Sequence, residues 1–262
     1  VIMAMGDDHT GESSTTLHQS DWAMLDAYMP IVSPAGVQEI LDYGQYAWAL
    51  SRYAGVWVGL KTMKDTIEVT SVVDADPHRM QFVTPDIDLP DGGLNIRLVD
   101  TPQLQEARMI DHKRAAAEAF SRANKMDQRK WGNADAKIGF VAAGKNYLDL
   151  VHALNLLGID ADTAVDMGIT TYKVGQVWPL DTASFNACAD NLDLIVVVEE
   201  KRKLLEVQIK EALFDDRRGR RVYGWHKGDV QHDGKRQELF PTKADLNPIW
   251  IAEQLGAVLV EE

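Results

Sequence analysis

The densest run of polar side chains lies near the start of the chain, in GDDHTGESSTTLHQSDW at residues 6–22. It contains two histidines, four acids and several hydroxyl residues, which can bind ions, exchange protons or hold a polar substrate. The apolar residues VIMAM (1–5) come directly before it and predict a buried parallel strand. Because ligands in open α/β sheets bind beyond the carboxyl ends of strands, this loop is the leading candidate for a functional site.

Six residues of the loop are predicted to lie near a substrate or cofactor, and no catalytic residue is singled out among them. They are His9, Ser13, Ser14, His18, Gln19 and Asp21. Histidine is suited to proton transfer near neutral pH, and it can also donate a hydrogen bond to a carboxylate. We therefore expect His9, His18 and Gln19 to make the main polar contacts.

Other interpretations of the loop stay open. Four of its side chains are of metal-ligand type: Asp7, Asp8, His9 and His18. Their spacing matches no known metal motif, so no metal site is predicted. A serine hydrolase is disfavoured because the chain has no GxSxG elbow. The plainest interpretation is a polar loop whose side chains bond its own backbone.

The segment GFVAAGKN (139–146) has a glycine–lysine pair like that of a phosphate-binding loop. That motif needs Ser or Thr after Lys145, where this chain has Asn146, and the residues before Gly144 are strand-like rather than rich in glycine. We expect Lys145 to be structural.

Two charged clusters have ordinary interpretations beside functional ones. Glu199 and Glu200 end a strongly apolar strand, so one of them could face a crevice or interface. Alternatively, both are solvated and pair with Lys201 or Arg202. The basic run RRGRR (217–221) has no interleaved aromatic residues, which favours a solvated turn over an RNA contact.

The elements that position these residues belong to a chain of 262 residues with a formal net charge of −13 at pH 7. Such an acidic chain is a poor non-specific ligand for nucleic acid or an anionic membrane. Its one cysteine, Cys188, excludes an intrachain disulfide and an all-cysteine iron–sulfur cluster, and it suits the reducing cytoplasm. No apolar run approaches the length of about 18 residues that would predict a membrane-spanning helix.

Strand-like and helix-like segments alternate along the chain, which predicts an α/β fold with a mostly parallel sheet. Further strands are predicted at 29–34, 56–61, 67–73, 137–143, 163–168, 192–200 and 220–225. Helices are predicted at 17–28, after the Ser33–Pro34 cap, at 103–130, between Gly144 and Gly158, from the Asp181–Thr182 cap to Ala189, at 201–214 and within the tail. The alternation breaks near Pro77, and residues 84–102, rich in proline and glycine, predict connecting chain.

Several quoted segments together resemble one family. GDDHTGESSTTLHQSDWAML and PIVSPAGVQEILDYGQYAWALSRYAGVWVGLK resemble the later part of the pyrimidine-binding domain of 2-oxoacid:ferredoxin oxidoreductases. LPDGGLNIR, AGKNYLDLVHALNLLGID, VWPLD and VVVEEKRKLLEVQIKE resemble the transketolase C-terminal-like domain of the same enzymes. The motifs follow the family's order, and the long, fused bacterial indolepyruvate form is the most similar.

The resemblance implies oxidative decarboxylation of an arylpyruvate such as indolepyruvate to an aryl-acetyl-CoA, with ferredoxin as electron acceptor. It implies thiamine diphosphate, magnesium and iron–sulfur clusters in the full enzyme, coenzyme A as a substrate, and a cytoplasmic homodimer. The family's glutamate for the aminopyrimidine and its GDG…N motif for magnesium are missing from this sequence. We therefore expect this chain alone to be inactive and to bind no cofactor tightly.

The resemblance also divides the chain. It implies a partial pyrimidine-binding domain at 1–83, a connector with a long helix at 84–136, a transketolase C-terminal-like domain at 137–230, and a tail of unknown role at 231–262. This favours a middle segment of a longer polypeptide. Alternatives are a structural or dimerisation module without a complete active site, or part of another thiamine-dependent 2-oxoacid dehydrogenase or transketolase.

One departure from the family concerns substrate binding. Several relatives carry an arginine in the segment equivalent to HQSDWAML, where it can meet the substrate carboxylate, and this chain has none there. The resemblance therefore implies that His18, Gln19 or another segment makes this contact.

Overall fold

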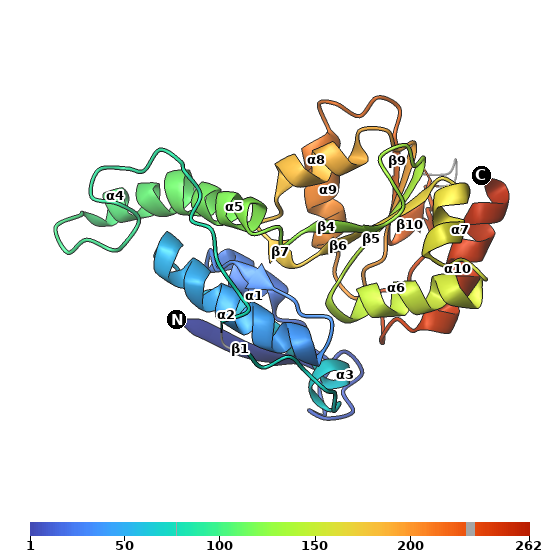
Figure 1. Cartoon of the computed structure of the whole chain (residues 1–262), viewed down its shortest axis with the longest axis horizontal. Coiled ribbons are helices and arrows are strands. Elements are labelled where there is room, and N and C mark those ends of the chain that lie inside the picture. Colours follow the sequence, from blue (N-terminus) through green and yellow to red (C-terminus); the bar gives the residue numbers. More distant parts are fainter. Residues whose placement is uncertain (77, 229–233) are drawn as a thin grey trace. The chain divides into compact units, whose positions relative to one another are not determined.

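The computed structural model describes residues 1–76, 78–228 and 234–262 (Figure 1). The predicted break at Pro77 and the predicted boundary between 230 and 231 lie outside these residues. The chain forms two units that alternate along the sequence. Unit 1 comprises Val1–Asp7, Ser20–Asp127 and Gly175–Asp181, and unit 2 comprises Asp8–Gln19, Gln128–Val174 and Thr182–Glu262. The division into family domains predicted above stays a prediction.

Unit 1 contains a four-stranded sheet in the order β1-β3-β2-β7. Its strands are β1 (Ile2–Asp7), β3 (Val58–Met63), β2 (Ile31–Val32) and β7 (Gln176–Trp178). β3 pairs in parallel with both β1 and β2, whereas β7 runs antiparallel to β2. The first strand is parallel as predicted, but it is not fully buried, because it lies at the sheet edge and leaves Met3 37% exposed.

Two helices of unit 1 pack over this sheet. Buried aromatic and aliphatic residues of α2 (Val37–Ala54) join those of β3 and α5 (Arg114–Ala123) in one apolar core, which is why α2 carries its apolar side chains at helical spacing. The predicted Ser33–Pro34 cap is wrong: α2 begins after Gly36, and the side chain of Glu39 accepts from the backbone N–H of Ala35 at 2.8 Å. The shorter helices are α1 (Asp21–Asp26) and α3 (Lys64–Ile67).

The long helix predicted at 103–130 is present but shorter. α4 (Pro102–Ala107), the π-helical segment η1 (Arg108–Lys113) and α5 follow one another and end at Ala123. Its last part is not a solvated helix, because Ala116, Ala117 and Phe120 are buried. The residues beyond its end form β4 (Gln128–Trp131), the first strand of the other unit.

Unit 2 contains a five-stranded sheet in the order β4-β6-β5-β8-β9. Its other strands are β6 (Ile169–Val174), β5 (Ile138–Ala143), β8 (Leu194–Val197) and β9 (Arg221–Tyr223). All neighbours pair in parallel except β4, which is antiparallel to β6. β5 and β8 lie inside the sheet, as their continuous apolar runs predict. β10 (His226–Lys227) and β11 (Gln237–Glu238) form a separate pair.

Helices lie on both sides of this sheet (Figure 1). α6 (Gly144–Leu156), α7 (Ala161–Asp166) and α10 (Pro248–Glu261) contribute to one apolar core with β5, β6 and β8. α8 (Thr182–Ala189) and α9 (Leu205–Leu213) lie on the other side. Since Phe240, Leu246 and Leu255 are fully enclosed in the core, the described part of the tail is an integral piece of unit 2.

Two predicted strands are wrong. Residues 163–168 belong mainly to helix α7, because Asp160 caps its start by accepting from the backbone N–H of Thr163 at 2.8 Å. The strand follows immediately as β6. Residues 67–73 pair with no strand among the described residues, and Val72 is 99% exposed. Their β-branched composition therefore has no sheet to join.

The α/β class with mostly parallel sheets is confirmed. No helix in the described part of the chain is long and apolar enough to cross a membrane.

Candidate functional site

The polar loop after β1 closes on the carboxylate of Asp8. Asp8 Oδ1 accepts from the backbone N–H of Gly11 at 2.8 Å, and Oδ2 accepts from those of Ser13 and Ser14 at 2.7 Å each. Burial acts to raise the pKa of Asp8, but the backbone N–H groups of Ser14, Ser13 and Gly11 outweigh it and hold that pKa well below its ordinary value. This part of the loop follows the plainest interpretation, a segment bonded to itself.

His9 departs from that pattern. Its ring is only 4% exposed, and its Nδ1 lies 2.6 Å from Oε1 of Glu200. The two residues are 191 positions apart in sequence, and both belong to unit 2. Its second ring nitrogen, Nε2, is buried and has no hydrogen-bond partner among the described residues. One ring nitrogen of His9 is thus held by Glu200, and the other has no partner among the described residues.

Glu200 is held from three directions. Besides His9, its Oε2 accepts from the backbone N–H of Leu246 at 2.7 Å, and Lys145 Nζ lies 4.0 Å from the same oxygen. Burial acts to raise the pKa of Glu200, but the hydrogen bond with His9 and the charge of Lys145 outweigh it, so that the pKa is lowered. Glu200 is therefore a buried carboxylate stabilised in its charged form.

The remaining predicted loop residues are dispersed. His18 is exposed, and its backbone N–H donates to the carbonyl of Asp8 at 3.2 Å. Gln19 Oε1 accepts from the backbone N–H of Arg202 at 3.0 Å, which ties the loop to the segment after β8. Ser13 and Ser14 are exposed; their backbone N–H groups donate to Asp8, and the hydroxyl of Ser14 donates to the carbonyl of Thr16 at 2.9 Å. The structure thus brings His9 to a charged partner but does not gather the six residues around one point.

Asp21 belongs to a separate buried cluster in unit 1. Lys61 Nζ lies 2.6 Å from Oδ2 of Asp21 and 3.5 Å from Oδ2 of Asp7. Asp7 also accepts from the hydroxyl of Ser20 at 2.5 Å. The ion pairs join the first turn of α1 to β1 and β3, so Asp21 has a structural role in unit 1.

The described residues do not fit a metal centre. Among them, no group of three or more His, Cys, Asp or Glu side chains is arranged to hold a metal ion. The side chains considered for a metal have other partners: Asp8 the loop backbone, His9 a glutamate, and Asp7 a lysine. They therefore do not form the carboxylate set that magnesium and the diphosphate of a thiamine cofactor would require.

The other predicted motifs are occupied by structural contacts. Lys145 donates to Asp149 and to the carbonyl of Leu246, both at 2.7 Å, as expected of a structural lysine. Glu199 accepts from the backbone N–H groups of Leu204 and Leu205, at 2.8 Å each. In the basic run, Arg218 and Arg221 pair with neighbouring acids.

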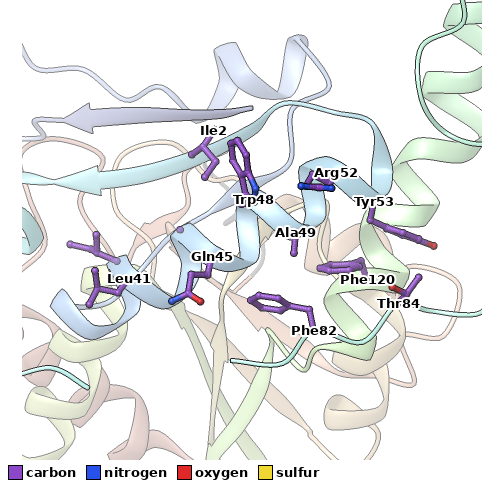
Figure 2. A pocket seen from close by; sticks show the side chains of 12 residues that line it. Ile2, Leu41, Gln45, Trp48, Ala49, Arg52, Tyr53, Phe82, Thr84 and Phe120 are labelled. Atoms are coloured by element: carbon purple, nitrogen blue, oxygen red, sulfur yellow. The ribbon is translucent and has the colours of Figure 1, made fainter. Parts of the chain in front are cut away.

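A separate groove of about 910 Å³ lies in unit 1. Trp48 and Arg52 of α2 line it together with Phe82 and Phe120, as Figure 2 shows. Trp48 is 53% exposed. None of the six predicted loop residues lines this groove, and sequence analysis did not single it out.

Sequence analysis also missed the role of Glu200 as the partner of His9. A signal was present, because two adjacent glutamates at the carboxyl end of a buried strand are unusual in a core. The topology was needed to pair one of them with a residue of the first loop.

Comparisons with known proteins agree with this fold. The model of the family described as the indolepyruvate oxidoreductase domain matches residues 128–262, just over half of the chain. Indolepyruvate oxidoreductase subunit IorA of Pyrococcus abyssi is 26% identical over 220 residues, which cover 82% of this chain and 32% of that protein. The IorA subunit of Methanothermobacter thermautotrophicus is 22% identical over 263 residues, covering all of this chain and 40% of that protein. The chain thus spans 32% and 40% of the length of these two relatives.

Two solved structures have a similar fold. A split-gene transketolase, described as an inactive beta4 tetramer, superposes with a TM-score of 0.53 at 13% identity, covering 99% of this chain and 66% of that one. The 2-oxoglutarate:ferredoxin oxidoreductase from Magnetococcus marinus, with 2-oxoglutarate, coenzyme A and succinyl-CoA bound, also gives 0.53, at 11% identity, covering 98% and 48%. At such identities the likeness concerns the fold alone, and it is consistent with a transketolase C-terminal-like domain.

Proposed function

The chain belongs to the indolepyruvate oxidoreductase domain family, and from this premise we propose that it is a segment of an enzyme that oxidatively decarboxylates an arylpyruvate to an aryl-acetyl-CoA. Ferredoxin is the proposed electron acceptor, and the enzyme is proposed to be cytoplasmic. The family match over residues 128–262 carries the proposal. That the chain spans about a third of its IorA relatives supports a segment of a longer enzyme.

Within that enzyme, we assign the loop at 8–19 to the neighbourhood of the substrate. His18 is exposed, and Gln19 lies beside the segment that follows β8. Either side chain can donate to the carboxylate of a 2-oxo acid and so take the place of the arginine that relatives carry in this segment. The order of the elements supports this, since the loop follows the carboxyl end of a parallel strand.

Turnover by the full-length enzyme tests the proposal. Indolepyruvate, phenylpyruvate and 2-oxoglutarate are each supplied with coenzyme A and oxidised ferredoxin, and both ferredoxin reduction and the acyl-CoA product are measured. We expect the two arylpyruvates to be preferred. A preference for 2-oxoglutarate would refute the arylpyruvate specificity, and no turnover of any 2-oxo acid would refute the reaction class.

The cofactors thiamine diphosphate, magnesium and iron–sulfur clusters are proposed for the full enzyme only. The described residues of this chain do not form a magnesium site. We expect calorimetric titration of the chain with thiamine diphosphate and magnesium to give no tight binding, whereas the full enzyme should bind. Sub-micromolar binding by the chain itself would contradict this assignment.

A second candidate function is assembly of the enzyme into a homodimer. The apolar groove of unit 1, with the half-exposed Trp48, favours it, because exposed apolar patches often mark protein interfaces. The relatives are described as subunits, and one structure of similar fold is described as a tetramer. We propose a second copy of this chain as the occupant.

Sedimentation velocity tests the assembly role. Trp48→Glu should convert dimer to monomer, because it places a charge in the apolar groove. Trp250→Glu is the matched control, since Trp250 is 44% exposed on α10 and is not one of the residues that line the groove. A wild-type chain that sediments as a monomer at all concentrations would contradict the role.

A further inference from the structure

The unpartnered nitrogen of His9 calls for an explanation. Buried polar atoms are nearly always hydrogen-bonded, because leaving one without a partner costs free energy. Nε2 of His9 is enclosed in unit 2 and has no partner among the described residues. The ring itself is nearly fully buried, so solvent does not take that place at the surface. A catalytic role is one of the explanations for such a group in a native structure.

Glu200 fixes which nitrogen is left over. Because its pKa is lowered, Glu200 is an anion and can only accept a hydrogen bond, so Nδ1 of His9 must carry the hydrogen across the 2.6 Å contact. In the neutral ring this leaves a lone pair on Nε2. The pairing is the arrangement by which a carboxylate orients a histidine base and stabilises its charged form.

The carboxylate is itself held rigidly. Its second oxygen accepts from the backbone N–H of Leu246 and faces Lys145 at 4.0 Å. Lys145 is in turn fixed by Asp149 and by the carbonyl of Leu246. These contacts come from α6 and from the segment before α10, so Glu200 cannot turn away from His9 without breaking them.

We infer that Nε2 of His9 is a general base that takes the proton of the acyl-acceptor thiol, with Glu200 as its positioning residue; this inference rests on the proposed function. In the proposed reaction the substrate carboxylate is already ionised near neutral pH, whereas a thiol with an ordinary pKa of about 8.5 is still mostly protonated. The S–H bond breaks, its proton goes to Nε2, and the thiolate keeps the electron pair. The positive charge gained by the ring lies against Glu200.

Nitrogen NMR tests the geometry on the chain itself. With ¹⁵N-labelled histidine, two-bond ¹H–¹⁵N spectra report which ring nitrogen carries hydrogen. We expect Nδ1 of His9 to be protonated in the wild type, and Glu200→Gln to weaken that preference, because an amide can also donate to Nδ1. A bare Nδ1 in the wild type would overturn the assignment. His152→Asn removes an exposed histidine, so the signals that it loses are those of His152 and not of His9.

Kinetics of the full-length enzyme test the role. In His9→Asn the amide nitrogen takes the place of Nδ1 and can still donate to Glu200, but nothing replaces Nε2. Formation of aryl-acetyl-CoA from indolepyruvate and coenzyme A should fall about 10²–10⁴-fold. In Glu200→Gln the same rate should fall about 10- to 100-fold, as expected for the loss of a hydrogen bond to a charged group. The rate of His152→Asn should match that of the wild type. In His9→Ala, added imidazole should restore part of the rate.

The outcomes separate this inference from the proposed function. An active wild type with an unimpaired His9→Asn enzyme overturns the inference alone. In His9→Asn the loss in thioester formation should exceed the loss in coenzyme A-free consumption of indolepyruvate by about tenfold or more. Equal losses overturn the assignment to the thiol. Absence of any 2-oxo acid turnover by the wild type overturns the proposed function, and this role with it.

Discussion

At the scale of single residues, Asp127 carries a buried carboxyl in unit 1 whose pKa is raised. Its Oδ1 accepts from the backbone N–H groups of Gly175 and Gln176 at 2.8 and 3.1 Å. Its Oδ2 is buried and has no partner among the described residues. Burial outweighs those hydrogen bonds and raises the pKa of Asp127 to about 7. As pH rises, the unfolded chain therefore releases the proton of Asp127 first, and the native state keeps it up to a higher pH.

This shift predicts how the free energy of unfolding depends on pH. The stabilisation by protonated Asp127 is complete below the ordinary pKa of 3.8 and is lost as pH rises to about 7. Asp127→Asn keeps the acceptor at Oδ1 and carries no charge. As pH rises from about 5 to about 8, we expect the free energy of unfolding of the variant to increase by on the order of 3 kcal/mol relative to that of the wild type.

Urea unfolding of both proteins at the two pH values measures this gain. Asp166→Asn is the matched control, because Asp166 is exposed on α7. Parallel changes in wild type and Asp127→Asn would show that Asp127 is charged in the native state.

At the scale of elements, the glycine inside α2 and the glycine directly after it have opposite requirements. Gly55 ends the helix with φ of 63°, a left-handed conformation that favours glycine, and a Cβ there would lie 2.6 Å from the carbonyl oxygen of Leu94. Gly44 lies inside the helix, and a Cβ there would meet nothing within 4 Å. The same substitution should therefore have opposite effects at the two positions.

Gly55→Ala should lower the free energy of unfolding by about 1–3 kcal/mol, because it adds backbone strain and a clash with the connecting chain. Gly44→Ala should raise it by about 0.5–1 kcal/mol, because alanine restricts the unfolded chain and favours the helix. Chemical denaturation of the two variants measures both values. Equal destabilisation by the two substitutions would contradict the distinction.

Element prediction from the sequence succeeded where apolar patterning was strong. The run LIVVV and the segment KIGFVAA became β8 and β5, since such runs can be buried only inside a covered sheet. It failed at 163–168, where a capping aspartate outweighed strand-like residues. It also failed at β6, whose buried residues include Thr170, Thr171 and Lys173 and so give no apolar signal.

The candidate site was predictable only in part. The position of the loop after a strand pointed to His9, and the apolar run before it located Glu200 at the end of another strand. Their contact depends on how the chain folds back over 191 residues, and local patterning does not contain that information. Asp8 was considered as a metal ligand, but the backbone N–H groups that it accepts from are invisible in a list of side chains.

At the scale of the whole molecule, the two units exchange chain segments. By their bounds, the chain passes between them after Asp7, Gln19, Asp127, Val174 and Asp181. β7 of unit 1 follows directly after β6 of unit 2 and is followed by α8 of unit 2. Loss of structure in unit 2 would release both ends of this short strand.

We therefore expect heat to unfold the two units together. Gly55→Ala in unit 1 and Leu154→Ala in the core of unit 2 should each lower the temperature of one shared transition. Leu154 is fully buried, so its truncation should cost about 2–5 kcal/mol. Differential scanning calorimetry should give equal calorimetric and van't Hoff enthalpies. Two resolved peaks, each moved by only one variant, would contradict this coupling.

The position of β7 has a consequence for the inheritance of this architecture. The family match begins at residue 128, so a gene exchange at that point would transfer residues 175–181 with the indolepyruvate oxidoreductase domain. The recipient would gain a foreign β7, which belongs to the sheet of unit 1 and not to that of unit 2. The first 127 residues of the donor would lose β7, which is the antiparallel partner of β2. The same exchange would leave His9 behind and part it from Glu200. Recombination between relatives should therefore be tolerated only where both halves come from closely similar parents.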